Sequence, residues 1–255
     1  MSGRPSHPLS VVAIGAHMDD PWIGMGGAAL KAARKGHRVT MVQAVSMYGS
    51  WPVVSGREAE IRPIIEGVAR DSGVELLTLG YDYMRLENGP VLTNELSRVL
   101  ADLRPDILFC HAEDDSNQDH VALGTASRVA AMHGACFLKP DSDYRPPREI
   151  MQCRSAWQTN NFRPDTFLDV ADVALDLMEI LNVFDTIYNK GMPSPLYEIS
   201  VTDHVLGDRT VGLTGHTMHK FATCVDEGKQ CGARYAEGYM CYKRAAVGAE
   251  LLTQL

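Results

Sequence analysis

Hydrophobic and polar positions along the first half of the chain predict strands and helices in turn. Ser10–Gly15 is a short β-branched apolar run without alternation, which is typical of a strand buried on both faces of a parallel sheet. Further strands are predicted at His37–Ser46, Val74–Gly80 and Asp106–Cys110, and helices at Ala28–Lys35, Arg57–Ser72, Leu92–Leu103 and from Asp119 onwards. This order predicts an α/β fold with a Rossmann-like, mainly parallel sheet flanked by helices.

The pattern changes after Gly134, where strands and helices no longer alternate regularly. The second half is predicted to hold a proline-rich surface loop at Lys139–Glu149, an added strand at Ile150–Trp157, a long helix at Ala171–Tyr188, an insertion at Gly191–Gly215 and a last helix that begins near His216. Apolar residues recur at helical spacing in the long helix, which is typical of a core or of a subunit interface. We therefore expect extra C-terminal strands and helices after the parallel core.

The composition favours one domain. With 255 residues, of which 45% are hydrophobic and 22% are charged, the chain can bury one sizeable core. We expect a single domain over residues 1–255, with a core at 9–135 and a divergent part at 136–255. The net charge of −8 and the lack of any run of Lys or Arg in the sequence argue against nucleic acid as a partner.

The N-terminus and the cysteines favour a cytoplasmic location. The first apolar run breaks at His17, too early for a membrane span, and we interpret it as a strand and not as a signal peptide. The six cysteines form no CxxC pair, which argues against a disulfide framework or a cysteine-zinc site. We expect a cytoplasmic protein that does not contact a membrane.

The first group of chemically useful residues follows the first strand. His17, Asp19 and Asp20 should lie in the loop at its carboxyl end, where open α/β sheets bind ligands, and the glycines at 24–27 predict a turn before the helix. Imidazole and carboxylate are good zinc ligands, and a catalytic zinc keeps one position for water. Of two adjacent aspartates, one can bind the metal while the other faces the metal-bound water as a base. Alternatively, both cap the following helix.

A second group repeats this arrangement. The strand that ends at Cys110 leads into His111 and a polar loop, and Asp119 and His120 then open an apolar-periodic helix. His120 is the candidate ligand, whereas His111 is better explained as a structural imidazole.

These two groups resemble the motifs of the PIG-L/LmbE-like family of zinc-dependent N-deacetylases. AHMDD ahead of a Gly-Gly helix is similar to the family's first motif, NQDH is similar to its later one, and RYAEGY resembles its recurring YAE pattern. The resemblance implies Zn²⁺ on His17, Asp20 and His120, with Asp19 as general base.

The chain departs from the family's pattern at several positions. Met18 replaces a residue that contributes backbone more than chemistry, whereas Pro21 replaces an acid that supports the metal site. Asn117 stands where the family has a histidine, and an amide can donate a hydrogen bond to an oxyanion but cannot act as an acid. Asp119, which orients that histidine in the family, either holds Asn117 or caps the helix.

Another histidine of the family reaches the site from the long helix, and here Phe184 or Asp185 takes its place. His216, which follows Gly215, is the best remaining candidate for a general acid, with His219 one turn further on and His204 in the insertion. The alternative is that these are ordinary surface or capping histidines. We expect His216→Ala to lower turnover at least about tenfold with the zinc content intact.

Two residues are candidates for substrate binding. Arg57 matches a family arginine that meets polar groups of the substrate, although a solvated surface arginine explains it equally well. Trp51 lies in a loop beside the site, where a tryptophan can pack against a sugar ring or serve as a hydrophobic plug.

The resemblance implies a zinc-dependent hydrolase that removes the acetyl group from an N-acetylated amino sugar or sugar conjugate. The alternatives are an amidase for another small amide, such as a thiol conjugate or a natural-product intermediate, and a catalytically impaired metal-binding module. A dinucleotide site at the glycines is disfavoured because no acidic residue ends the second strand. A homo-oligomer is expected from the apolar long helix and the insertion after it.

Overall fold

The computed structural model describes residues 7–140, 142–155, 158–189, 197–201, 209–213, 215–244 and 251–255. The strands are β1 (Ser10–Gly15), β2 (Arg38–Met47), β3 (Glu75–Asp82), β4 (Ile107–His111), β5 (Glu149–Cys153), β6 (Thr166–Asp169), β7 (Tyr197–Val201), β8 (Arg209–Leu213) and β9 (Ala236–Lys243). The α-helices are α1 (Asp20–Arg34), α2 (Glu58–Asp71), α3 (Pro90–Leu103), α4 (Gln118–His133), α5 (Ala174–Tyr188) and α6 (Gly215–Cys231), and the 3₁₀-helices are η1 (Gly134–Phe137) and η2 (Leu252–Gln254).

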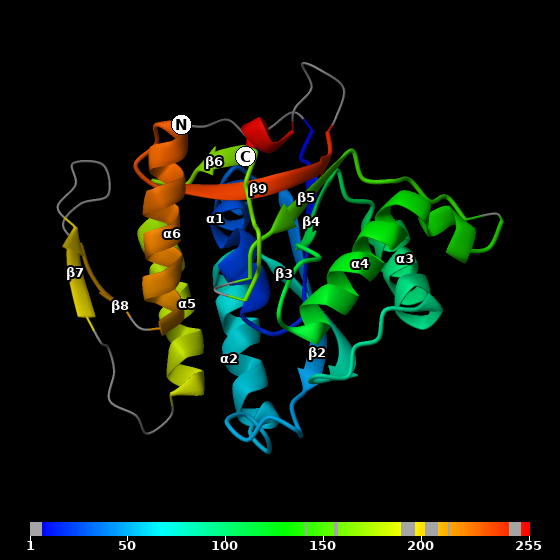
Figure 1. The fold of residues 1–255 in the computed structure, drawn as a ribbon, viewed down its shortest axis with the longest axis horizontal. Coiled ribbons are helices and arrows are strands. Elements are labelled where there is room, and N and C mark those ends of the chain that lie inside the picture. The colour runs from blue at the N-terminus through cyan, green and yellow to red at the C-terminus, as the bar shows by residue number, and fades with distance from the viewer. Residues whose placement is uncertain are drawn as a thin grey trace.

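The described strands form one sheet in the order β3-β2-β1-β4-β5-β9-β6 and a separate β7-β8 hairpin. Strands β3, β2, β1, β4 and β5 run parallel. Helices α1, α5 and α6 pack together on one face, and α3 and α4 pack together on the other (Figure 1). The predicted α/β fold, mainly parallel and with extra C-terminal elements, is confirmed.

Strand β1 lies in the middle of the parallel part and is buried along its whole length, as its unbroken apolar pattern predicts. Its neighbours are β2 on one side and β4 on the other, so the order in which the chain adds strands to the sheet reverses between β1 and β4, although both strands run parallel. The crevice outside the carboxyl ends of two such strands is where open α/β sheets bind ligands. The topology therefore brings the loops after β1 and β4 together.

The C-terminal part adds antiparallel strands that the apolar pattern did not predict. Strand β9 pairs with β5 on one side and with β6 on the other, antiparallel in both cases. Strand β6 has only four residues, too few for a clear period of two, and its partner follows about 70 residues later in the chain. The predicted strand Ile150–Trp157 ends at Cys153, and Trp157 lies outside the described residues.

Helix α1 differs from its prediction, because it begins at Asp20 and contains the glycines that were expected to form a turn. A Cβ atom on Gly26 would lie 2.4 Å from Leu177 Cδ1, and one on Gly24 would lie 2.9 Å from Cys153 Cβ. These glycines therefore allow the helix to pack closely against its neighbours. Met25 has non-helical angles, with φ −149° and ψ 26°, so the helix is kinked between its two segments.

Candidate active site

Three ligand-type atoms converge where the loops after β1 and β4 meet. His17 Nδ1 lies 3.1 Å from Asp20 Oδ2, and His120 Nε2 lies 3.2 Å from both atoms. Four-coordinate zinc with ligands at roughly 2.0–2.1 Å requires ligand atoms about 3.3 Å apart. All three side chains are buried, so the cluster has the donor types, spacing and enclosure that a metal ion needs.

Secondary structure sets this triangle. His17 lies two residues after the end of β1, Asp20 is the first residue of α1, and His120 lies in the first turn of α4. Asp20 Oδ2 also accepts the backbone N–H of His17 at 2.6 Å, so the turn holds its own carboxylate in place. The pairing of β1 with β4 then places His120 opposite this turn.

Asp119 supports the cluster through His17. Its Oδ2 lies 3.1 Å from His17 Nε2, and its two carboxylate oxygens accept the backbone N–H groups of Met84 and Leu86 at 2.7 and 3.1 Å. Burial opposes the charged form, but the hydrogen bonds from His17 and the backbone lower the pKa of Asp119. The Asp119 carboxylate therefore neither holds Asn117 nor caps the helix, the two roles that the sequence suggested. It orients the His17 ring instead.

Asp115 gives His120 the same kind of support, and sequence reasoning missed it. Its Oδ1 lies 3.1 Å from His120 Nδ1, while its Oδ2 accepts the hydroxyls of Ser155 at 2.6 Å and Thr159 at 2.9 Å. Burial again opposes the charged form, yet these hydrogen bonds lower the pKa of Asp115 to about 2. The signal in the sequence was the pair of aspartates in the loop between β4 and α4.

His111 lies behind the cluster. Its Nε2 accepts the backbone N–H of Ala16 at 2.9 Å, which occupies the lone pair that a metal would need. Its ring stacks on that of His120 at 4.3 Å, and burial lowers its pKa. This geometry agrees with a structural imidazole.

A cavity of about 220 Å³ opens beside the triangle. Four residues that the sequence suggested for catalysis or substrate binding line this cavity: Asp19, Asn117, Trp51 and His216. Its remaining lining residues are His17, Asp20, Ile23, Tyr83, Ser155, Gln158 and Tyr188. The cavity therefore joins the candidate metal ligands to groups that can move protons.

Asp19 occupies the N-cap position of α1, but its side chain makes no capping hydrogen bond. It is 7% exposed, and burial together with the neighbouring Asp20 charge raises its pKa, against the opposing effect of His216 and His17. A carboxylate with these surroundings is a suitable proton acceptor. The capping alternative for Asp19 has no support in the geometry.

His216 reaches the cavity from the first turn of α6. Its Nδ1 lies 2.5 Å from Asp185 Oδ1, and its Nε2 lies 3.8 Å from Asp19 Oδ2. Asp185 is buried and its other oxygen accepts the backbone N–H and hydroxyl of Thr217 at 3.3 and 3.2 Å. Burial opposes protonation of His216, but Asp185 and Asp19 raise its pKa. Asp185 thus supports the histidine, a function that sequence reasoning did not assign, whereas Phe184 is buried in the core.

Asn117 is the N-cap residue of α4. Its Oδ1 accepts the backbone N–H of Asp119 at 2.9 Å. Asn117 also lines the cavity, so its NH₂ group is the part of the amide that can donate a hydrogen bond to a molecule there.

Trp51 belongs to an aromatic cluster and contributes only part of its surface to the cavity. Its ring stacks on Tyr83 at 5.1 Å and lies 5.0 Å from Tyr188 and 5.9 Å from Tyr48. Tyr83 and Tyr188 also line the cavity, and sequence reasoning did not single them out. The hydroxyl of Tyr188 is buried beside the Asp19 carboxylate, which lowers the pKa of Asp19 and raises that of Tyr188.

Arg57 does not line the cavity, so the structure does not support the expected contact with a substrate. Its guanidinium donates to the backbone carbonyls of Val53 at 3.1 Å and Ile187 at 3.0 Å, and it faces Glu60. These bonds join the loop before α2 to the end of α5. The arginine bridges two elements that are 130 residues apart, which no local pattern reveals.

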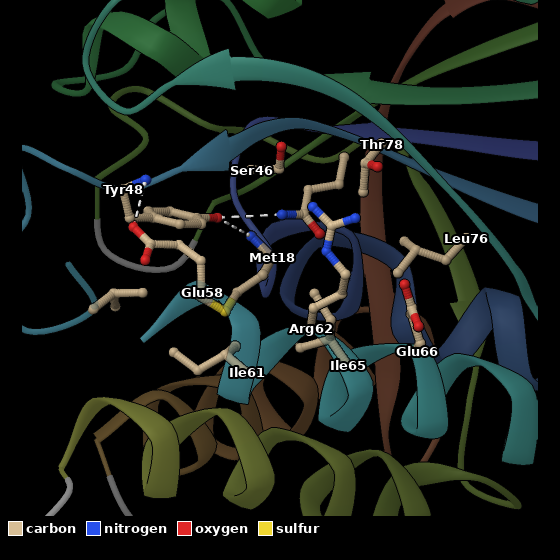
Figure 2. A pocket seen from close by; sticks show the side chains of 12 residues that line it. Met18, Ser46, Tyr48, Glu58, Ile61, Arg62, Ile65, Glu66, Leu76 and Thr78 are labelled. Atoms are coloured by element: carbon tan, nitrogen blue, oxygen red, sulfur yellow. Dashed lines mark hydrogen bonds between the residues drawn. The ribbon is translucent and has the colours of Figure 1, made fainter. Parts of the chain in front are cut away.

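A much smaller cavity of about 20 Å³ lies behind the loop that carries the triangle, between β2, β3 and α2 (Figure 2). Within it the Tyr48 hydroxyl accepts the backbone N–H of Met18 at 3.2 Å and donates to the carbonyl of Val45 at 3.2 Å. Met18 therefore contributes its backbone to the loop, as its place in the motif implied. The volume has room for about one water molecule and not for a substrate.

Fold and site together define an α/β protein with a candidate metal centre at the topological switch point of its sheet. Residues 12–131, which include all three candidate ligands, match the family model PIG-L, GlcNAc-PI de-N-acetylase. The resemblance to the PIG-L/LmbE-like family is thus confirmed over these residues, and the hydrolase class that it implied is confirmed with it. In the described part of the chain no helix has the length and apolar character to cross a membrane.

Solved structures share this fold over nearly the whole chain. N,N'-diacetylchitobiose deacetylase from Pyrococcus horikoshii is similar with a TM-score of 0.68 and 22% identity, covering 93% of this chain and 87% of that one. The conserved protein TT1542 from Thermus thermophilus gives 0.67 and 18%, covering 92% and 94%. The 4-carboxy-2-hydroxymuconate hydratase GalB from Pseudomonas putida gives 0.69 and 16%, covering 94% and 98%. The fold therefore accommodates more than one reaction, and the site must decide between them.

Proposed function

We propose that this protein is a zinc-dependent N-deacetylase that hydrolyses the acetamide of an N-acetylated amino sugar or sugar conjugate. The observation that carries the proposal is the placement of Asp19 and His216 on the cavity wall beside the triangle of His17, Asp20 and His120, with Asp185 bound to His216 from behind. A metal-assisted amide hydrolysis needs a ligand set with an open position, a base for water and an acid for the leaving amine.

Two histidines and one carboxylate, with a cavity on the open side, fit a catalytic zinc ion, which takes three protein ligands and keeps a fourth position for water or substrate. When bound, such an ion supplies polarisation of the amide carbonyl and lowers the pKa of a bound water to about 7. The contacts of Asp119 with His17 and of Asp115 with His120 fix both rings for this task.

Protons are handled by the residues of the chain. Asp19 accepts the proton of the attacking water, because its carboxylate lies in the cavity wall and makes no capping bond. His216 donates a proton through Nε2 to the departing nitrogen, since Asp185 binds its Nδ1 and favours the protonated ring. The NH₂ group of Asn117 donates a neutral hydrogen bond to the oxyanion.

The cavity wall favours a substrate with a ring. Trp51, Tyr83 and Tyr188 form an aromatic side of the cavity, against which the apolar face of a sugar ring can pack. The acetylated amino sugar of the chitobiose deacetylase from Pyrococcus horikoshii is a substrate of this kind, and the family model carries a related activity in its description. All six cysteines are free, which supports the proposal of a cytoplasmic location.

The test combines metal analysis with acetate release from a panel of N-acetyl sugars. We expect about one zinc ion per chain and activity on at least one sugar. Asp19→Asn should lower kcat by about 10²- to 10⁴-fold with the zinc content unchanged, while the control Asp114→Asn, a loop residue that binds Asn160 and Asn161, should keep full activity.

Other outcomes separate the alternatives. A purified protein without metal, or an Asp19→Asn variant with full activity, contradicts the mechanism. Release of an amine from another amide, with no acetate from any sugar, indicates the small-amide hydrolase. Zinc binding without turnover of any amide indicates the impaired metal-binding module.

A further inference from the structure

We propose that Glu237, in the RYAEGY segment, is a positioning residue for the candidate metal centre and acts through the kinked helix α1. The inference rests on the proposed function, because it requires that His17, Asp20 and His120 hold a metal ion. Glu237 lies on β9 and touches none of the three candidate ligands. It connects the two ends of the chain, since its hydrogen bonds to α1 span about 210 residues.

The kink in α1 creates a need for hydrogen-bond acceptors. Met25 departs from helical angles, and it divides the helix into a first segment that begins with Asp20 and a second that begins at Gly26. The first N–H groups of a helical segment have no acceptor within the segment itself. In a buried position, an N–H group without a partner is destabilising, because it has lost its hydrogen bond to water.

Glu237 supplies these acceptors. Its Oε1 accepts the backbone N–H of Gly27 at 2.9 Å, and its Oε2 accepts that of Ala28 at 2.8 Å. The carboxylate thus caps the second segment from another part of the fold, at the end of a helix where negative charge is favourable. Gly27 permits this approach, because a Cβ atom there would lie 2.9 Å from Glu237 Cδ and 2.7 Å from Val170 Cγ1.

Other buried groups hold the carboxylate still. Lys220 Nζ on α6 lies 2.7 Å from Oε1, and the Tyr239 hydroxyl donates to Oε2 at 2.6 Å. Glu237 is 1% exposed and Lys220 is 4% exposed. Burial opposes the charge on Lys220, but Glu237 raises the pKa of Lys220 above its usual range, so the ammonium group stays charged beside the carboxylate. Four donors therefore fix both oxygens of Glu237.

The kink matters to the metal centre because the first segment carries Asp20. Five residues from Asp20 to Gly24 make a lever of about 7 Å at 1.5 Å per residue, and a change of about 20° in the kink would move Asp20 by about 2–3 Å. A functional site tolerates errors of only about 0.5 Å. Straightening of α1 would therefore separate Asp20 Oδ2 from His120 Nε2, which lie 3.2 Å apart.

Glu149 provides a matched control. It is 1% exposed, and its two carboxylate oxygens accept the backbone N–H groups of Leu251 at 2.8 Å and Leu252 at 3.0 Å. It caps a short segment with the same two-oxygen geometry, but it stands at the first residue of β5, at the opposite end of that strand from the candidate site. Glu149→Gln and Glu237→Gln thus weaken equivalent capping interactions. The first lies far from the candidate metal site, and the second is linked to it through α1.

The experiment measures the Kd for Zn²⁺ by competition titration of the metal-free proteins, together with their thermal unfolding. Both variants should unfold at lower temperature than the wild type. Glu237→Gln should raise the Kd by about 10- to 100-fold, the range for residues that support metal ligands, whereas Glu149→Gln should leave it unchanged. Equal Kd values for a folded Glu237→Gln protein and the wild type would overturn the positioning role.

A different result would contradict the proposed function. That proposal predicts zinc binding by the wild type, so a wild-type protein without affinity for zinc would contradict the metal site itself. If Glu237→Gln does not fold, Tyr239→Phe decides, since it removes one donor to Oε2 and retains the ring. A higher Kd in Tyr239→Phe supports the proposal, and an unchanged one contradicts it.

Discussion

Replacement of Asp185 by asparagine tests the His216–Asp185 pair. The variant keeps the size of the side chain and removes its charge, next to a histidine whose Nδ1 is 2.5 Å away. Among the described residues, the charged and titratable groups near His216 include Asp185 and Tyr188 on α5 and Asp19 in the loop after β1. In Asp185→Asn, the charges of Asp19 and Asp20 still oppose the effect of burial on the pKa of His216, but the charge in direct contact with Nδ1 is lost.

The size of the effect follows from the lost interaction. A hydrogen bond to a charged group contributes about 1.5–3 kcal/mol. In the wild type, Asp185 raises the pKa of His216 against the effect of burial, so its replacement should lower that pKa. The kcat/KM of the variant should therefore fall at lower pH than that of the wild type.

Stability gives an independent readout with a definite sign. Because the folded-state pKa of His216 is raised, its contribution to stability is fully present below the unfolded pKa of about 6.5 and is lost as the pH rises through the folded value. The difference in unfolding free energy between wild type and Asp185→Asn should accordingly be larger at pH 6 than at alkaline pH.

The assays are the pH profile of kcat/KM and an NMR titration of ¹⁵N-labelled histidine. Asp176→Asn is the matched control, because Asp176 lies on the same helix and pairs with Arg34 and Arg209 instead of His216. It should leave the His216 titration unchanged. A pKa of His216 that is the same in Asp185→Asn as in the wild type would refute the reasoning.

Two further predictions concern metal affinity and assembly. Asp119→Asn should weaken zinc binding by about 10- to 100-fold, because it removes the carboxylate that orients His17, and a Kd equal to that of the wild type in competition titration would contradict this. We also predict a homo-oligomer, motivated by the apolar face of α5; light scattering should give a mass that is a multiple of 28.0 kDa, and a monomer at working concentration would exclude it.

Local sequence patterns determined the parallel half of the fold and the outline of the candidate site. Strand β1 has the predicted bounds, and the predicted β2, β3 and β4 shift by only one or two residues. Strands β1 and β4 are buried along their whole length, which requires the unbroken apolar runs that predicted them. The motif residues lie in the turn after β1 and in the first turn of α4, which follows β4. Since the carboxyl ends of parallel strands meet at one edge of a sheet, the pattern alone was sufficient to bring His17, Asp20 and His120 near one another.

Only the tertiary structure decided which side chains support these groups. The contact between His216 and Asp185 joins two helices, and Arg57 donates to the carbonyl of Ile187, 130 residues away in the sequence. Glu237 caps a helical segment that is about 210 residues away. The predicted turn at the glycines of α1 was wrong for the same reason. These glycines lie within the helix and allow it to pack closely against Leu177 and Cys153. Periodicity and turn chemistry report the surroundings of a residue within its own element, whereas contacts such as these depend on how distant elements pack.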